Sequence, residues 1–311
     1  MTNTIFPGNY LSETLPAMPP LTGCFALTEG LDGHALPFSI DDLFGADALL
    51  GPAIPASPAE LDRFFKVKAP VYFCHEVTST FNVGGALAKR GLLPAWSAVL
   101  ATKQSAGRGQ FRRHWQSPEG NLYVTFRLPN ASFFNTEAAA LFIGLLLSHA
   151  LERLGYPLQL KWPNDLLNPD QEKTAGILVE KRNEILLAGV GINLRTLPEE
   201  AQLRADRATM AGLLKCSNGK LCQLSPFSLW KALVYEAISL YSHALTQPID
   251  TILPELANRF LAWKGEAVTL SDANGNTLNG ILRGVGPSGG LRIAQADGSI
   301  HERLSGSLAR T

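Results

Sequence analysis

Two periods of apolar residues along the chain predict its secondary structure. A period of two across 121–128 predicts a half-buried strand, and apolar runs at 71–74 and 97–101 predict two more strands. Helical spacing predicts helices at 82–90, 136–154, 226–244 and 249–263. The pattern therefore predicts a domain that contains both helices and strands.

The segment between residues 158 and 194 is rich in predicted strands. Its apolar runs lie at 158–162, 166–167, 175–180 and 185–194, with short turn clusters between them. Connections this short favour an antiparallel meander over a parallel crossover. After Gly265, short strands alternate with turns, which predicts a small β-barrel. A module of under about 50 residues is marginal alone, so we expect it to dock on the larger domain.

The first 62 residues differ in composition from the rest of the chain. They hold eight prolines and eight acidic residues, and the first Lys or Arg is Arg63. A DNA-binding head neutralises phosphates with cations, so this composition argues against DNA as a partner. Many apolar residues lie among the prolines. We therefore expect residues 1–66 to form an irregular extension that packs on a main domain at 67–264, followed by a C-terminal domain at 265–311.

The overall composition excludes several classes of protein. The chain has 27 basic and 27 acidic residues, so no global field favours nucleic acid or an anionic membrane. The N-terminus lacks the pattern of a secretory signal, and the densest apolar run, 138–147, is too short to span a bilayer. Four cysteines without C-x-x-C spacing predict buried or free thiols in a reducing cytoplasm.

Candidate chemistry begins with a loop at 103–115 that is rich in glycine and arginine. Gly107 and Gly109 allow the backbone to approach a ligand closely. Arg108 and Arg113 supply forked, permanently charged donors to phosphate oxygens. Most basic runs are only solvated surface, so this loop alone is weak evidence for a phosphate site.

Three further motifs follow the loop: K-W-P-N-D at 161–165, K-T-A-G-I-L-V-E at 173–180 and G-V-G-I-N at 189–193. Pro-Asn-Asp is also an ordinary turn signal, and a lysine beside an aspartate is commonly a surface pair. Glycines inside strands often mark a backbone that another group approaches closely. Together the motifs place Lys161, Lys173 and Asn193 on one small sheet, where we expect them to converge on one site.

In this order, and with Ser79-Thr80 and the S-P-x-G-N-L-Y run at 117–123, these motifs resemble those of biotin protein ligases, in the biotin and lipoate ligase family. The resemblance spans residues 67–311. It implies an α+β catalytic domain of the class II aminoacyl-tRNA-synthetase-like type, with a mixed, mostly antiparallel sheet and flanking helices. It also implies a small SH3-like C-terminal β-barrel.

The same resemblance implies a two-step reaction and a role for each motif residue. ATP would activate biotin to biotinyl-5′-AMP, and a lysine of a biotin carboxyl carrier protein domain would then accept the acyl group. Biotin would contact Ser79, Thr80, Gln104, Gly107, Arg108, Gln110, Lys173 and Gly176. ATP or the adenylate would contact Arg113, Trp115, Lys161, Asn164, Asp165 and Asn193, and Mg²⁺ would bind Asp165 and Asn193. Lys173 and Arg108 would be the catalytic residues, acting by positioning and electrostatics.

Three positions depart from the pattern of the family. Gln110 stands where Arg is common, Arg112 stands where Gly is frequent, and Phe81 displaces an amide to Asn82. Three alternatives stay open: a lipoate or other acyl ligase on the same fold, a biotin-responsive repressor, and a non-catalytic biotin-binding module. The N-terminus without basic residues argues against the repressor. The oligomeric state is also open, with a homodimer among the options.

Overall fold

A computed structural model of the 311-residue chain describes residues 3–7, 24–29, 71–131, 134, 138–182, 185–199 and 209–311. The chain forms two compact units. The first unit contains Met1–Pro129, Leu178–Thr196 and Gln223–Ala232, and the second contains Asn130–Ile177, Leu197–Cys222 and Leu233–Thr311.

The first unit is built on a sheet with the strand order β1-β2-β3-β4-β5-β9-β8. These strands are β1 (Asn3–Pro7), β2 (Cys24–Glu29), β3 (Val71–Val77), β4 (Ala98–Gln104), β5 (Leu122–Arg127), β9 (Ile185–Ile192) and β8 (Lys173–Arg182), of which residues 178–182 belong to this unit. β3 and β4 pair in parallel, and the other recorded pairs among β1 to β5 and β9 are antiparallel. The mixed, mostly antiparallel sheet confirms the predicted fold class.

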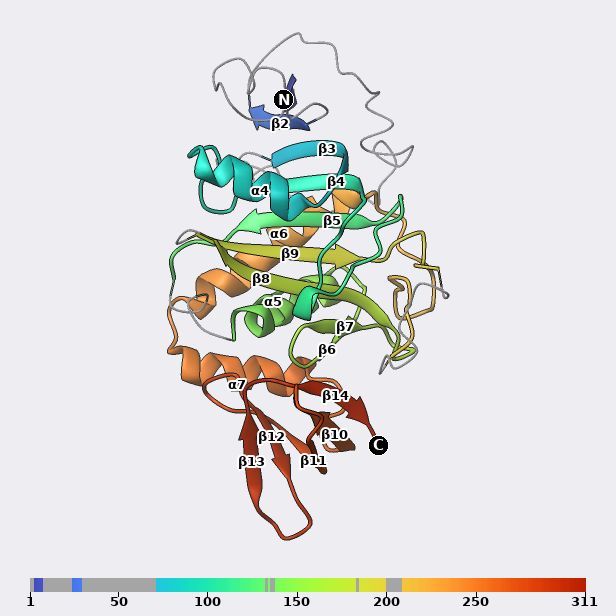
Figure 1. The fold of residues 1–311 in the computed structure, drawn as a ribbon, viewed down its shortest axis with the longest axis vertical. Coiled ribbons are helices and arrows are strands. Elements are labelled where there is room, and N and C mark those ends of the chain that lie inside the picture. Colours follow the sequence, from blue (N-terminus) through green and yellow to red (C-terminus); the bar gives the residue numbers. More distant parts are fainter. Residues whose placement is uncertain are drawn as a thin grey trace. The chain divides into compact units, whose positions relative to one another are not determined.

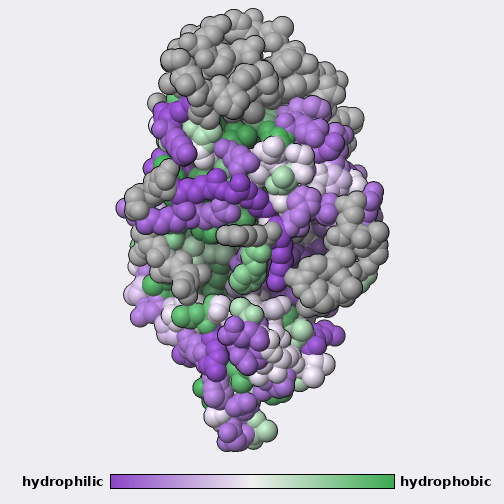
Figure 2. Space-filling view, in the orientation of Figure 1, coloured by the Kyte–Doolittle hydropathy of each residue, from purple (hydrophilic) through white to green (hydrophobic). Residues whose placement is uncertain are grey.

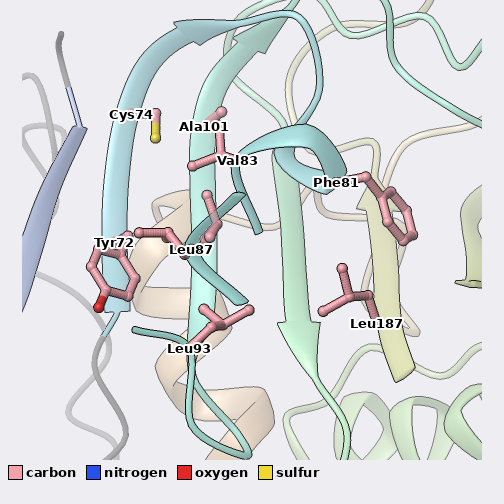
Figure 3. Close-up of a cluster of buried hydrophobic side chains, with 9 residues drawn as sticks. Tyr72, Cys74, Phe81, Val83, Leu87, Leu93, Ala101 and Leu187 are labelled. Atoms are coloured by element: carbon pink, nitrogen blue, oxygen red, sulfur yellow. The ribbon is translucent and has the colours of Figure 1, made fainter. Parts of the chain in front are cut away.

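Helix α4 (Thr80–Lys89) connects the two parallel strands and covers one face of the sheet, against β4, β5 and β9 (Figure 1). It begins two residues earlier than predicted because the Ser79 side chain accepts a hydrogen bond from the Phe81 nitrogen and caps the helix. In Figure 3, Val83 and Leu87 of α4 lie near Tyr72 and Ala101 of the adjacent strands. This buried cluster fixes the start of α4 on the sheet.

Strand β5 is buried on both faces, whereas the sequence predicted a half-buried strand. Leu122 to Phe126 are all buried, with at most 6% of each residue exposed. Thr125 faces α4, where its Oγ1 lies 2.8 Å from Thr80 Oγ1. Phe126 packs on Trp230 of α6 (Pro226–Ala244), with ring centroids 5.2 Å apart. A second helix therefore covers the face that the alternation had assigned to solvent.

The second unit contains the predicted antiparallel meander. β6 (Gln159–Lys161), β7 (Asp165–Leu167) and the first half of β8 pair in that order. Helix α5 (Ala139–Arg153) packs on β6 and β7, and α7 (Ile249–Phe260) packs on α5 and β6. Helix α7 ends three residues before the predicted end, because Leu261 pairs with Leu160 and the Ala262 nitrogen donates to the Leu160 oxygen at 2.9 Å.

The C-terminal part of the second unit is a five-stranded antiparallel sheet, as expected for an SH3-like barrel. Its order is β13-β12-β11-β10-β14, formed by β10 (Ala267–Ser271), β11 (Thr277–Val285), β12 (Leu291–Ala294), β13 (Ile300–Arg303) and β14 (Ser307–Arg310). β11 packs against α7, and Trp162 Nε1 donates to the Gly289 oxygen at 3.0 Å. Both contacts agree with the expected docking of this module.

The N-terminal block and the cysteines depart from their predictions. Asn3–Pro7 and Cys24–Glu29 form strands that extend the sheet beyond β3, where the sequence predicted irregular structure. The other residues up to 70 lie outside the described residues. Cys74 is disulfide-bonded, which contradicts the prediction of thiols, whereas Cys216 and Cys222 are not. Spacing could not show this, because a disulfide depends on which segments of the chain the fold brings together.

The visible surface carries both hydrophilic and hydrophobic residues. Figure 2 shows hydrophilic residues spread over the visible face, with smaller hydrophobic areas between them. Within the described part of the chain, every helix falls short of the length and apolar character that crossing a membrane requires.

Candidate functional site

In the first unit, the Gln104 amide is the centre of a buried hydrogen-bond network. Its Oε1 accepts from the Thr80 nitrogen at 2.9 Å and from Thr80 Oγ1 at 3.2 Å, and its Nε2 donates to Ser117 Oγ at 2.9 Å. Val77 and Gln104 are partners at the carboxyl ends of the parallel strands β3 and β4. Because α4 starts just after β3, Thr80 meets Gln104 there. This edge of a sheet is where α/β folds commonly bind ligands.

The glycine-arginine loop folds back on itself as a small hairpin at this edge. Arg108 and His114 form an antiparallel bridge, and the Trp115 nitrogen donates to the Gly107 oxygen at 2.9 Å. A Cβ atom at Gly107 would overlap the Trp115 oxygen and lie 2.6 Å from Ser117 Oγ. Gly107 is therefore required for the loop to close on its own backbone.

Arg108 is fastened by two side chains of the first unit. Its Nη2 donates to Asn82 Oδ1 at 2.5 Å, and its Nη1 lies 3.5 Å from Glu180 Oε2. Arg182 also binds Glu180 Oε2, at 2.7 Å from Nη2. One carboxylate thus serves two guanidinium groups, which leaves an excess of positive charge beside the loop.

The tip of the loop differs from the rest. Gln110 begins a single 3₁₀ turn, η2 (Gln110–Arg112), and Phe111 within it has a left-handed backbone with φ 55°. The Phe111 side chain is 66% exposed, and Arg113 Cζ lies 5.3 Å from its ring centroid. A left-handed backbone is uncommon for a bulky residue such as phenylalanine. The loop therefore presents Gln110, a ring and a guanidinium to solvent.

In the first unit, Trp115 contacts β9 and Asn193 follows that strand. A Cβ at Gly191 would lie 2.5 Å from Trp115 Nε1, so the glycine of β9 lets the indole rest on the strand. Asn193 follows β9 and is 3% exposed. The next turn is held by Asn121 Oδ1, which accepts from the Leu194 nitrogen at 2.8 Å.

In the second unit, Asp165 is shared by two lysines. Lys173 Nζ lies 2.7 Å from Asp165 Oδ1, and Lys161 Nζ lies 3.9 Å from Asp165 Oδ2. The β6–β7 pairing sets Lys161 opposite Asp165, and the β7–β8 pairing sets Asp165 opposite Gly176, which has no side chain to obstruct the carboxylate. The backbone of Lys173 is held by Met210 and Gly212 through bonds of 2.7 and 2.9 Å.

This cluster, Lys161, Asp165 and Lys173, has the chemistry of an anion site. Two ammonium groups of this cluster face the Asp165 carboxylate. Lys161 is 6% exposed, whereas the side chain of Lys173 is 31% exposed and can reach a ligand. Buried charge of one sign interacts strongly with an approaching phosphate because little water screens it. Asn164, by contrast, joins β7 to β8 through its Nδ2 bond to the Ile177 oxygen at 2.8 Å.

The predicted site residues are divided between the two units. Ser79, Thr80, Gln104, Gly107, Arg108, Gln110, Arg113, Trp115 and Asn193 lie in the first unit, and Lys161, Asn164, Asp165, Lys173 and Gly176 lie in the second. Within the second unit, Lys161 and Lys173 both contact Asp165, a shared partner that the sequence did not predict. Ser79 acts as a helix cap. Convergence of Asn193 with these lysines stays a prediction.

Sequence reasoning missed four residues that hold these sets in place: Asn82, Ser117, Asn121 and Trp263. Asn82 binds Arg108, a contact that its position after Phe81 did not predict. Ser117 and Asn121 stood inside the S-P-x-G-N-L-Y run, so that motif was the available signal. Trp263 lies about 100 positions from Lys161, whose Nζ is 5.5 Å from its ring centroid, and no local pattern links the two.

Comparisons with known proteins agree on one family. Residues 78–196 match the biotin/lipoate A/B protein ligase family. The bifunctional ligase/repressor BirA of Escherichia coli K12 is 35% identical over 149 residues, which cover 40% of this chain and 45% of that protein. A biotin--[acetyl-CoA-carboxylase] ligase of Paracoccus denitrificans is 36% identical over 114 residues, covering 34% and 46%. The chain thus spans less than half the length of these two relatives.

A solved structure covers more of the chain. It is a biotin protein ligase from Aquifex aeolicus in complex with biotin and ATP, with 31% sequence identity and a TM-score of 0.61. The likeness covers 78% of this chain and 99% of the Aquifex chain. The shared fold therefore extends well beyond the segment 78–196.

Proposed function

Because the chain belongs to the biotin/lipoate A/B protein ligase family, we propose that it is a biotin protein ligase. It activates biotin with ATP and transfers the biotinyl group to a lysine of a biotin carboxyl carrier domain. The observation that carries this proposal is the cluster in which Lys161 and Lys173 share Asp165. The Aquifex relative, solved with biotin and ATP, supports the choice of substrates.

The Gln104 network is suited to hold biotin. A ureido ring presents donors and acceptors that need fixed polar partners in a mainly apolar pocket. Thr80, Gln104 and Ser117 are buried and already oriented by bonds of 2.9 to 3.2 Å among themselves. Such preorganised groups lose little further freedom when a ligand binds.

The first step joins biotin to the α-phosphate of ATP. A carboxylate oxygen of biotin attacks the α-phosphorus, the bond from that phosphorus to the bridging oxygen breaks, and pyrophosphate leaves. The reactants are anions that repel each other, so the ammonium of Lys173 lowers the barrier by neutralising charge as they approach. Arg108 serves the same purpose from the loop, and Lys161 serves the nucleotide. Arg113 and Trp115 hold the adenylate.

The second step transfers the biotinyl group. The uncharged ε-amine of the carrier lysine attacks the acyl carbon of biotinyl-5′-AMP. The bond from that carbon to the phosphate oxygen breaks, AMP leaves, and the amine loses a proton as the amide forms. The loop at 107–115 must exclude water until the carrier arrives, because hydrolysis would waste the adenylate.

Mg²⁺ enters the proposal together with ATP. Asp165 offers carboxylate oxygens and Asn193 an amide oxygen, which are the donors that Mg²⁺ prefers. Among the described residues, no group of three or more Asp, Glu, His or Cys side chains is gathered to hold a metal ion. Mg²⁺ usually keeps several waters and binds substrate phosphates, so phosphate oxygens and water would supply its other ligands, and the bound ion would neutralise phosphate charge.

The proposal also concerns repressor activity, location and oligomeric state. The repressor activity in the name of the E. coli relative is not extended to this chain, because the first 62 residues contain no Lys or Arg. A cytoplasmic location stays a prediction. The homodimer stays one of the options for the oligomeric state.

Reconstitution tests the proposed function. The protein is incubated with ATP, Mg²⁺, biotin and a biotin carrier domain, and the biotinylated lysine is located by mass spectrometry. Excess lipoate serves as the competitor. A carrier that takes lipoate in preference to biotin, or no acyl group at all, would refute the assignment.

A lysine variant tests the central observation. Lys173→Ala should abolish biotin-dependent release of pyrophosphate while the protein stays folded. Lys215→Ala is the matched control, because Lys215 is also ion-paired in the second unit, with Asp170 at 2.6 Å and Glu172 at 3.3 Å. Equal activity of the two variants would contradict the role of Lys173.

A further inference from the structure

Two residues of the second unit have a left-handed backbone and are bonded to each other. Gln171 has φ 62° and Trp263 has φ 63°. The indole Nε1 of Trp263 donates to Gln171 Oε1 at 2.7 Å. This conformation is costly for residues other than glycine, and such strain concentrates at functional sites. A strained pair joined by one hydrogen bond therefore calls for a functional explanation.

The backbone before Trp263 is tied to β6. Leu261 forms a parallel bridge with Leu160, and the Ala262 nitrogen donates to the Leu160 oxygen. Lys161 directly follows Leu160 in β6, and Trp263 directly follows Ala262 in the segment after α7. Trp263 is 5% exposed, and Lys161 Nζ lies 5.5 Å from its ring centroid. The Lys161 ammonium thus lies over the face of the Trp263 indole.

An aromatic ring is a suitable neighbour for a lysine that must bind phosphate. The ring face attracts a cation through its quadrupole, and it carries no net charge. It can therefore fix the position of the Lys161 ammonium without neutralising it. A second carboxylate in that position would cancel the charge that the nucleotide requires.

The other end of the indole holds the loop that leads to Lys173. Gln171 stands two residues before Lys173. Its Nε2 donates to Gln159 Oε1 at 3.1 Å, and its backbone nitrogen donates to the Asn168 oxygen at 2.9 Å. The Trp263 bond thus fastens a loop whose position sets where β8 begins.

We propose that Trp263 is a positioning residue for adenylation, acting through both lysines of the cluster. Its ring holds Lys161 for the nucleotide, and its N–H holds the Gln171 loop and thereby Lys173 for the reacting atoms. This inference rests on the proposed function. It assigns a second role to the segment that joins α7 to the C-terminal sheet, beyond connecting the two.

Three variants separate the two roles. Trp263→Leu removes the ring and the donor, Trp263→Phe keeps a ring and removes the donor, and Gln171→Leu removes the acceptor alone. The measurements are ATP affinity by calorimetry, KM and kcat for biotin-dependent pyrophosphate release, and Tm. Trp96→Leu is the matched control, because Trp96 also has a left-handed backbone (φ 69°) and its ring stacks on Phe126.

The ring role predicts effects on ATP binding. Trp263→Leu should weaken ATP binding and raise KM for ATP by about tenfold, within the range of a partly desolvated cation–π contact. Trp263→Phe should restore both to about the wild-type values, and Trp96→Leu should leave them unchanged. Wild-type ATP affinity in folded Trp263→Leu, or no restoration by Phe, would overturn the inference.

The N–H role predicts effects on turnover. Trp263→Phe and Gln171→Leu should each lower kcat by about three- to tenfold, the value of one intramolecular hydrogen bond, with KM for ATP unchanged. An unaltered kcat in folded Gln171→Leu would overturn this half. Absence of biotin-dependent turnover in the wild type would instead refute the proposed function, and ATP affinity would still test the role of the Trp263 ring.

Discussion

Asn82 Oδ1 of α4 accepts a hydrogen bond from Arg108 Nη2, and this bond fastens the glycine-arginine loop to the helix that starts at Thr80. Asn82 also donates to Thr78 Oγ1 at 2.9 Å, so its amide is fixed in orientation. The amide is free to face the loop because Phe81, one position earlier, points instead toward β9 (Figure 3). Phe81 therefore packs on β9, and the amide displaced to Asn82 contacts the loop instead.

Removing the Asn82 amide should loosen the loop. Asn82→Ala is expected to raise the dissociation rate of biotinyl-5′-AMP by about two- to fivefold, since the bond to Arg108 is exposed and worth at most about 1 kcal/mol. Stopped-flow measurement of adenylate release gives the rate. Asn274→Ala, in the exposed turn between β10 and β11, is the control and should release the adenylate at the wild-type rate.

Charge at the loop tip should control retention of the adenylate. Gln110→Arg is expected to slow adenylate dissociation by about two- to tenfold, because a guanidinium adds attraction to the phosphate that a neutral amide lacks. Gln110→Lys tests whether charge alone is sufficient. An unchanged dissociation rate in Gln110→Arg would contradict this prediction.

Gly189 should tolerate no side chain while Phe81 is present. A Cβ at Gly189 would overlap the Phe81 ring, so Gly189→Ala is expected to lower the free energy of unfolding by about 1–3 kcal/mol. In a Phe81→Leu background the same substitution should cost less. Urea denaturation of the four proteins gives the coupling, and additive effects would count against the contact.

Gly85→Ala is the control for this prediction. Its added methyl would lie 3.3 Å from Arg182 Nη1, the far end of a flexible side chain, and alanine favours the helix by roughly 1 kcal/mol. Stability should therefore stay the same or rise.

His149 should make stability depend on pH. Burial lowers the pKa of His149, and the positive charges of Arg259 and Arg153 lower it further, against opposing effects of Glu152 and Glu236. The folded state thus favours the neutral ring, which packs edge-on against Phe260. The resulting stability is fully present above the ordinary pKa of about 6.5 and is lost as the pH falls toward the lowered folded value.

Urea denaturation between pH 7.5 and 5.5 measures this effect. His149→Gln should reduce the loss of unfolding free energy over that interval. His243→Gln, at an exposed position near the end of α6, is the control and should keep the wild-type slope. An identical slope in His149→Gln would assign the pH dependence to other groups.

The sequence by itself determined the helices, the meander and the candidate residues of the site. The period of apolar residues indicates which side of an element is buried, and turn residues indicate where the element ends. Both signals are contained in a short stretch of sequence. The motifs from Gly107 to Asn193 identified the family because several chemically demanding residue types occur in one order.

Only the tertiary structure decided what those residues contact. Three contacts join residues that lie far apart in the sequence or on different elements. They are the ion pairs of Lys161 and Lys173 with Asp165, the contact of Lys161 with the Trp263 ring, and the bond from Arg108 to Asn82. The same holds for β5, whose second face is covered by α6, and for the early end of α7 against β6. Register and packing set these contacts, and they depend on which elements meet in space, a property that no local window of sequence contains.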